Sequence, residues 1–190
     1  MPEEALLVMD IQQGVVGRYG GDDDLLARLR RAIEGARQAG ILVVFVRVAF
    51  RPGYPEVPPP GDDPRKIPGI VRDPDETFVD GKPSAAVHTA LEPQPQDIVV
   101  VKKRINAFVG SDLEVILRSH GIRRIALTGI GTSGVVLSTL TDAVDRDYEV
   151  NVLADGCADS DDVLHRTLIE RLFPRRAGVT TVDEWVRSRA

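Results

Sequence analysis

Residues 125–139, IALTGIGTSGVVLST, decide how this chain folds. Ile125–Leu127 are typical of the end of a buried strand, and Gly129, Gly131 and Gly134 allow the backbone to turn sharply after it. The apolar residues that follow have the spacing of one helix face. A strand, a glycine turn and a helix form a ligand site at the carboxyl edge of an open α/β sheet, where the helix start offers N–H groups and a positive dipole end. The segment therefore predicts a binding site within an α/β fold.

Apolar runs elsewhere predict five further strands. ALLVM (5–9) and ILVVFVRV (41–48) are typical of strands buried on both faces of a parallel sheet. Strands alternating with helices predict a three-layer α/β/α fold with a six-stranded parallel sheet, and we expect residues 1–190 to form a single domain. The remaining strands are expected at 97–101, 150–154 and 179–182, and helices at 22–40, 84–91, 111–121, 135–147, 159–173 and 183–188.

The composition limits the class of protein. Hydrophobic residues make up 43% of the chain and charged residues 28%, which is typical of a globular protein. The net charge of −5 argues against nucleic acid or an anionic membrane as partner, because both favour a basic face. No apolar run approaches the roughly 20 residues of a membrane span, and the start MPEEALLVMD lacks the basic region of a signal peptide. With a single cysteine, these features predict a cytoplasmic protein.

Ligands in such a sheet lie at the carboxyl ends of the strands, so the residue after each strand is a candidate. These positions hold Asp10, Arg51, Lys102 and Asp155, besides the glycine turn. Asp10 and Lys102 each end a wholly apolar strand. A carboxylate and an ammonium brought together there would shift each other's pKa and could transfer a proton. The alternative is a helix cap or a structural ion pair.

The glycine turn has a second interpretation. Gly129-x-Gly131-x-x-Gly134 matches the dinucleotide fingerprint, with Asp155 about twenty residues further on. The fingerprint usually opens the first strand–helix unit, whereas this is the fourth. A mononucleotide-binding module thus stays a further alternative.

Other reactive side chains give weaker signals. His88, His120 and His165 lie in different segments with no zinc-site spacing, so we expect no metal. Cys157 has no base near it in sequence and is expected to be a small packed residue. Ser133 at the helix start is expected to cap the helix rather than act as a nucleophile.

Three segments, LLVMDIQQG (6–14), VVVKKRINAF (99–108) and LTGIGTSGVVLSTLTDAVDRDYEVNVLADGCAD (127–159), together resemble the isochorismatase-like (cysteine hydrolase) superfamily. The resemblance covers nearly the whole chain and implies a six-stranded parallel sheet flanked by helices. It places the catalytic aspartate at Asp10 and the catalytic lysine at Lys102. It also implies a cis peptide at Ile130–Gly131.

The sequence departs from this pattern at the nucleophile. The family's cysteine falls at position 135, which is Val135 here, and Thr139 holds the register. The metal cluster of nicotinamidases has no match either. The branch of the family that acts on isochorismate likewise lacks the cysteine and uses the aspartate to protonate a vinyl ether. Asp10 and Lys102 would suffice for that chemistry, and Val135 would shape the pocket.

We therefore predict a hydrolase of a small organic molecule that needs no cofactor, with a catalytically inert ligand-binding or interaction member as the alternative. N–H groups around 132–135 would bind an anion. Arg104, Asn106 and Phe108 would line the site or hold the turn after Lys102. The full set of expected substrate-binding residues is Gln13, Arg104, Asn106, Phe108, Ile130, Gly131, Thr132, Ser133 and Gly134.

Family members are commonly homo-oligomers, so the resemblance implies a homodimer or larger assembly. The proline-rich segment 51–74 carries the apolar residues Tyr54, Val57, Ile67 and Ile70. We expect this segment, or the helix after Gly134, to form the interface.

Overall fold

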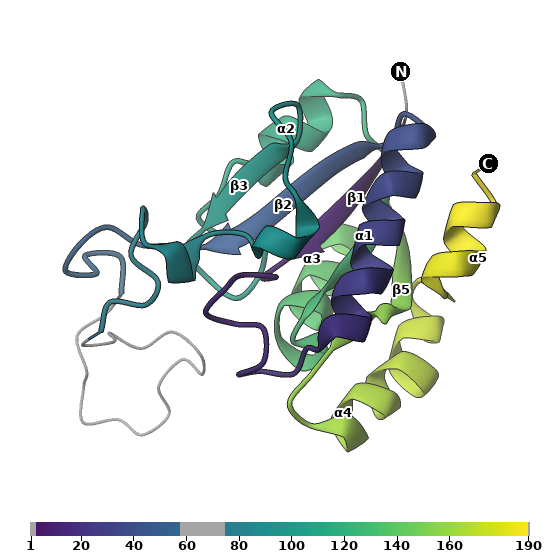
Figure 1. The fold of residues 1–190 in the computed structure, drawn as a ribbon. Helices are drawn as coiled ribbons and strands as arrows, with labels where there is room; N and C mark the ends of the chain where they lie inside the picture. The colour runs from purple at the N-terminus through teal and green to yellow at the C-terminus, as the bar shows by residue number, and fades with distance from the viewer. Residues whose placement is uncertain (1–2, 58–74, 190) are drawn as a thin grey trace.

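Six parallel strands form one sheet, as predicted (Figure 1). Their order in the sheet is β3-β2-β1-β4-β5-β6. The computed structural model describes residues 3–57 and 75–189. The strands are β1 (Glu4–Met9), β2 (Leu42–Val48), β3 (Ile98–Lys102), β4 (Arg124–Ile130), β5 (Glu149–Ala158) and β6 (Gly178–Thr180). The helices are α1 (Asp23–Gln38), α2 (Leu113–Ser119), α3 (Leu137–Asp145), α4 (Asp162–Thr167) and α5 (Val182–Arg187).

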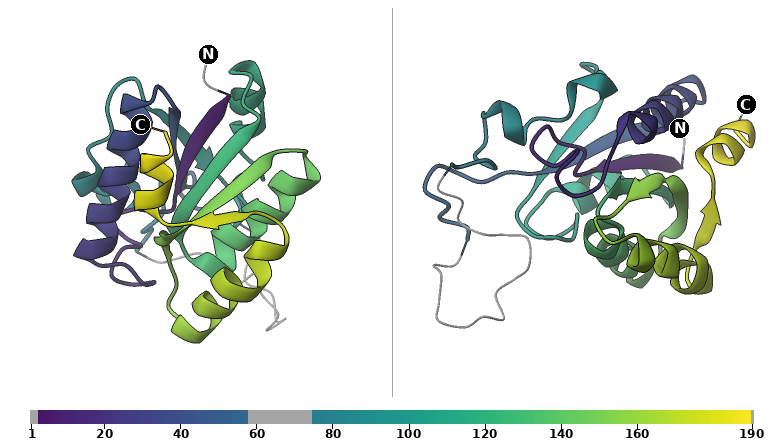
Figure 2. Two further views of the ribbon diagram at one scale, coloured as in Figure 1. Left: turned by 90° about the vertical axis from the view of Figure 1, so that its right-hand side faces the viewer. Right: turned by 60° about the horizontal axis from the view of Figure 1, so that its bottom comes forward.

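Helices cover both faces of the sheet. Figure 2 shows α1 and α5 on one side and α4 on the other. Successive side chains of a strand point to opposite faces, so β1 contributes to both layers. Leu6 and Val8 pack in the apolar cluster of α1 and α5, whereas Leu7 and Met9 pack in that of α2 and α3. This double burial explains the continuous apolar runs. None of the described helices is long and apolar enough to cross a membrane.

The strand order reverses between β1 and β4, the two strands at the centre of the sheet. In open α/β sheets the crevice at such a reversal is where ligands bind. The two strands meet closely there: Gly129 has φ +154°, and a Cβ atom on it would lie 2.5 Å from the carbonyl oxygen of Met9. The glycine turn therefore starts directly beside the end of β1.

Strand β5 is longer than the predicted 150–154 and irregular. Leu127 pairs with Val152, but Gly129, two residues on, pairs with Cys157. The extra residues of β5 move its carboxyl end to Ala158. Asp155 therefore lies within the strand, and its carboxylate accepts a hydrogen bond from the backbone N of Val182 at the start of α5.

Three predicted helices differ in the structure. The helix expected at 84–91 is wrong: Pro83–Ala85 and Thr89–Leu91 form separate 3₁₀ turns. The backbone here pairs instead with the loop after β1, for example Gly14 N with Ser84 O at 2.9 Å. The helix after the glycine turn begins with a π turn over Thr132–Val136 before α3. The helix expected at 159–173 starts at Asp162, capped by Asp161, and continues as a π turn over Leu168–Leu172.

The proline-rich segment is partly described. Tyr54 and Val57 are buried in a small cluster with Phe50 and Val79. These two apolar side chains are therefore covered by the chain's own residues. Ile67 and Ile70 lie outside the described residues.

Candidate active site

Asp10 and Lys102 meet at the carboxyl edge of the sheet. Asp10 directly follows β1, and its backbone at φ +57° is held by a hydrogen bond from its N to Val46 O. Lys102 ends β3, and its Nζ lies 2.9 Å from Asp10 Oδ2. Lys102 is 2% exposed and Asp10 8%, so the pair is shielded from water. The predicted approach of these two side chains is confirmed.

The ammonium of Lys102 is fixed in direction. Besides Asp10, its Nζ donates to the carbonyl oxygens of Arg104 and Ile105, both at 2.9 Å. An ammonium has three donors, and these three contacts use all of them. The turn after β3 therefore holds Lys102 against one oxygen of Asp10.

The second carboxylate oxygen of Asp10 forms no hydrogen bond with Lys102. Oδ1 is buried and has no hydrogen-bond partner among the described residues. Burial raises the pKa of Asp10 above its ordinary value of 3.8, although the charge and hydrogen bond of Lys102 act in the opposite direction. This carboxyl therefore stays protonated to higher pH than an exposed aspartate, and in its protonated form it can donate a proton.

A cavity of about 420 Å³ opens beside this pair. Its size suits a small organic molecule. Most of its wall is apolar. The lining residues are Asp10, Val15, Tyr19, Val48, Phe78, Lys102, Arg104, Ile105, Ile130, Gly131, Ser133, Gly134, Val135, Asp159 and Ser160.

The glycine turn forms one side of this cavity, and its Ile130–Gly131 peptide is cis, as the resemblance implied. The backbone N and the Oγ of Ser133 both donate to Asp159 Oδ2 at 2.7 Å. Burial opposes ionisation of Asp159, but these and further backbone hydrogen bonds hold its pKa below the ordinary value. One of the N–H groups expected to bind an anion is thus occupied by a carboxylate. A phosphate there would meet this negative charge, which disfavours the nucleotide alternative.

Val135 is 2% exposed and lines the cavity together with Asp10 and Lys102. Cys157, the single cysteine, is buried in the core beside Leu127 O and does not line this cavity. Burial raises the pKa of its thiol to about 12. The structure therefore agrees with the prediction that Cys157 is a packed residue.

Four of the expected substrate-binding residues do not line the cavity, and Gln13 and Thr132 are two of them. Gln13 is exposed and donates to Thr89 Oγ1, while its neighbour Gln12 is fully buried and bonds the backbone of β2. Thr132 is buried, with its Oγ1 2.8 Å from His165 Nδ1. The side chains of Gln13 and Thr132 are thus engaged outside the cavity.

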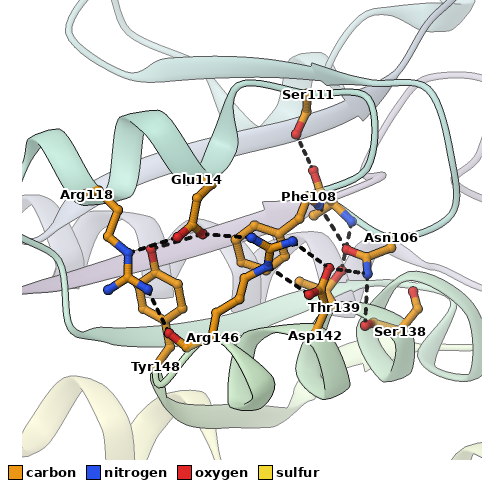
Figure 3. Close-up of polar contacts among 11 residues, drawn as sticks. Asn106, Phe108, Ser111, Glu114, Arg118, Ser138, Thr139, Asp142, Arg146 and Tyr148 are labelled. Carbon is orange, nitrogen blue, oxygen red and sulfur yellow. Dashed lines mark hydrogen bonds and ion pairs between the residues drawn. The ribbon is translucent and has the colours of Figure 1, made fainter.

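Asn106 and Phe108 hold the turn after Lys102, one of the two roles expected for them (Figure 3). Asn106 Nδ2 donates to Ser138 O and Asp142 Oδ2, and its Oδ1 accepts from Phe108 N. Phe108 stacks on Tyr148 with 6.1 Å between ring centroids. These contacts join the turn to α3, so neither side chain lines the cavity.

The structure also corrects the candidates at two strand ends. Arg51 is exposed and forms an ion pair with Glu56 at 2.7 Å. Asp155 Oδ1 accepts a hydrogen bond from the backbone N of Val182 at the start of α5. Asp159 takes the place in the cavity that the sequence assigned to Asp155, because β5 is irregular. The cavity residues missed from the sequence are Val15, Tyr19, Val48, Phe78, Ile105, Asp159 and Ser160.

Comparisons with known proteins agree with this geometry. The sequence profile described as Isochorismatase domain matches residues 4–184. The ureidoacrylate amidohydrolase RutB of Stutzerimonas stutzeri (strain A1501) is 35% identical, covering 81% of this chain and 69% of its own length. The uncharacterized isochorismatase family protein YecD of Escherichia coli O157:H7 is 30% identical over 95% of this chain and 93% of its own. The structure of an isochorismatase family protein from Burkholderia thailandensis superimposes with a TM-score of 0.81, at 30% identity, over 97% of this chain and 94% of that one.

Proposed function

The chain belongs to the isochorismatase family, and we propose that it hydrolyses a small vinyl-ether-type substrate with Asp10 as proton donor and without a cysteine nucleophile. The observation that carries this proposal is Asp10 Oδ1, which is buried at the cavity without a hydrogen-bond partner among the described residues, while Oδ2 is held by Lys102.

The step needs only these two side chains and water. Asp10 Oδ1 gives its proton to the terminal carbon of the vinyl group, and the ether oxygen stabilises the cation that forms. Water attacks that cation and returns a proton to Asp10, and the resulting hemiketal breaks to a ketone and an alcohol. Lys102 stabilises the carboxylate while Asp10 is ionised, since its ammonium is 2.9 Å away.

The valine at position 135 favours hydrolysis of a vinyl ether over hydrolysis of an amide. Some relatives are named ureidoacrylate amidohydrolases. The cysteine that the resemblance places at this position would attack an amide as a thiolate, whereas a valine side chain has no nucleophile. The thiol of Cys157 is buried outside the cavity with a raised pKa, so it does not replace the missing group.

Isochorismate and ureidoacrylate assayed side by side test the proposal. Wild type should hydrolyse the vinyl ether and not the ureide, and Asp10→Asn should lose a factor of about 10²–10⁴ in rate. Asp147→Asn is the matched control, because Asp147 also has a left-handed backbone, at φ +64°, but is exposed outside the cavity. Asparagine tolerates this conformation, so both variants should fold.

The outcomes separate the alternatives. Hydrolysis of ureidoacrylate at the same rate by wild type and Asp10→Asn would overturn the proposal. Binding of isochorismate without turnover would instead support the inert ligand-binding member of the family.

A further inference from the structure

The charged side chains that line the cavity differ in how fully their contacts offset their charge. The ammonium of Lys102 is fully engaged, because its Nζ contacts Asp10 Oδ2 and two backbone carbonyl oxygens, all at 2.9 Å. Asp159 is negative but is bound by the N–H and hydroxyl of Ser133. Arg104 is the remaining charged side chain of the lining, and it has no such partner among the described residues.

Arg104 contacts only neutral oxygen atoms in the described part of the chain. Its Nη1 donates to the carbonyl oxygens of Glu56, at 3.1 Å, and Lys103, at 2.6 Å. The carboxylate of Glu56 is itself engaged by Arg51 at 2.7 Å and Lys103 at 4.0 Å. These carbonyl oxygens orient the guanidinium, but no carboxylate of the described residues compensates its positive charge. The remaining donors of Arg104 suit a bidentate carboxylate.

The second carboxylate of the lining, Asp159, repels anions. Asp159 occupies the N–H of Ser133 at the helix start, where an anion would otherwise bind. A substrate carboxylate would meet a like charge there and an opposite charge at Arg104. The wall around these two groups includes Val15, Tyr19 and Phe78, which suit an apolar body.

We propose that Arg104 binds a carboxylate of the substrate, so that the cavity accepts a small organic acid with an apolar body. The backbone oxygen of Arg104 accepts a hydrogen bond from Lys102, which in turn contacts Asp10. A carboxylate held at Arg104 would thus occupy the same cavity as the proton donor. Protonation of the substrate by Asp10 rests on the proposed function, whereas binding of the substrate carboxylate by Arg104 does not.

Calorimetric titration with cinnamate and its neutral analogue cinnamamide tests this binding without turnover. Wild type should bind cinnamate at least about tenfold more tightly than cinnamamide, the difference expected for a charge-assisted contact. Arg104→Gln keeps the backbone carbonyl. It should weaken the affinity for cinnamate by about tenfold to a hundredfold and change the affinity for cinnamamide by less than about twofold. Arg104→Lys should recover part of the loss.

Arg51→Gln is the matched control, because it removes the same charge from an exposed neighbour outside the cavity. It should leave both affinities within about twofold. Equal losses in Arg104→Gln and Arg51→Gln, equal affinity of wild type for both compounds, or no binding of cinnamate at millimolar concentration would each overturn the inference. Asp10-dependent hydrolysis could still hold in those cases, so the two proposals fail separately.

Discussion

Lys102 Nζ lies 2.9 Å from Asp10 Oδ2 although the two residues follow strands that are not neighbours. Strand β2 separates β1 from β3, so the lysine side chain reaches past the end of β2 to the aspartate. The pair therefore exists only when all three strands are in register. This geometry leaves Asp10 Oδ1 without a partner among the described residues, beside the cavity.

The pH profile should show Asp10 acting as an acid. Its pKa is raised from 3.8 by burial, so the carboxyl stays protonated to higher pH than an exposed aspartate. A proton donor works only in that form, and kcat/KM should fall as pH rises through the raised pKa. Initial rates across a pH series would measure this. A kcat/KM that rises over the same range would show that Asp10 acts as a base.

Val135→Cys should create a reactive thiol. The new side chain would line the cavity beside Lys102, at a helix start, where thiol pKa values fall to about 3.5–7.5. Cys157 should react slowly, because burial raises its pKa to about 12. Mass spectrometry after iodoacetamide treatment would compare the two sites, and adding Asp10→Asn should alter the rate at position 135. The near-equal volume should keep the loss of unfolding free energy below roughly 1.5 kcal/mol.

Equal, slow labelling of both thiols in folded Val135→Cys would contradict the placement of position 135 in the cavity. The motif register would then be wrong, and with it the claim that the nucleophile is absent.

Asn106 should matter for stability more than Gln13. Asn106→Ala removes hydrogen bonds to Ser138 O, Asp142 and Phe108 N that hold the turn after Lys102 (Figure 3). We expect the free energy of unfolding to fall by about 1–3 kcal/mol. Gln13→Ala, the control, loses one exposed contact with Thr89 and should change the free energy of unfolding by less than about 0.5 kcal/mol. Urea denaturation would measure both, and equal effects would count against this division of roles.

The chain should form a homodimer or larger assembly, as the resemblance implies. Light scattering at micromolar concentration should then give at least twice the chain mass of 20.7 kDa. A monomer mass alone would contradict this expectation. The contribution expected from the segment 51–74 falls largely outside the described residues, and Tyr54 and Val57 are already buried within the chain.

The sequence predicts the sheet because strands buried on both faces are apolar throughout, as in residues 5–9. Asp10 and Lys102 could be predicted for a related reason: each ends such a run, where parallel strands share one edge. Asp159 could not be predicted, since the register shift between β4 and β5 leaves no mark in the pattern and favoured Asp155 instead.

Loop residues were harder to place. Tyr19 and Phe78 line the cavity from segments whose path depends on tertiary packing. Asn106 is a polar residue four positions after Lys102, and its type alone fits both substrate binding and holding a turn. Only its contacts with Ser138 and Asp142, 32 and 36 residues away in the chain, decide between the two roles.

The most direct test of Asp10 as proton donor is hydrolysis of isochorismate in D₂O, followed by NMR at early times. We expect wild type to release pyruvate with one deuterium in its methyl group, because the acid step adds a solvent-derived proton to the vinyl carbon. Asp10→Asn should slow this release by about 10²–10⁴, with Asp147→Asn unchanged. Pyruvate without deuterium, equal rates for wild type and Asp10→Asn, or no release of pyruvate by wild type would contradict the role of Asp10.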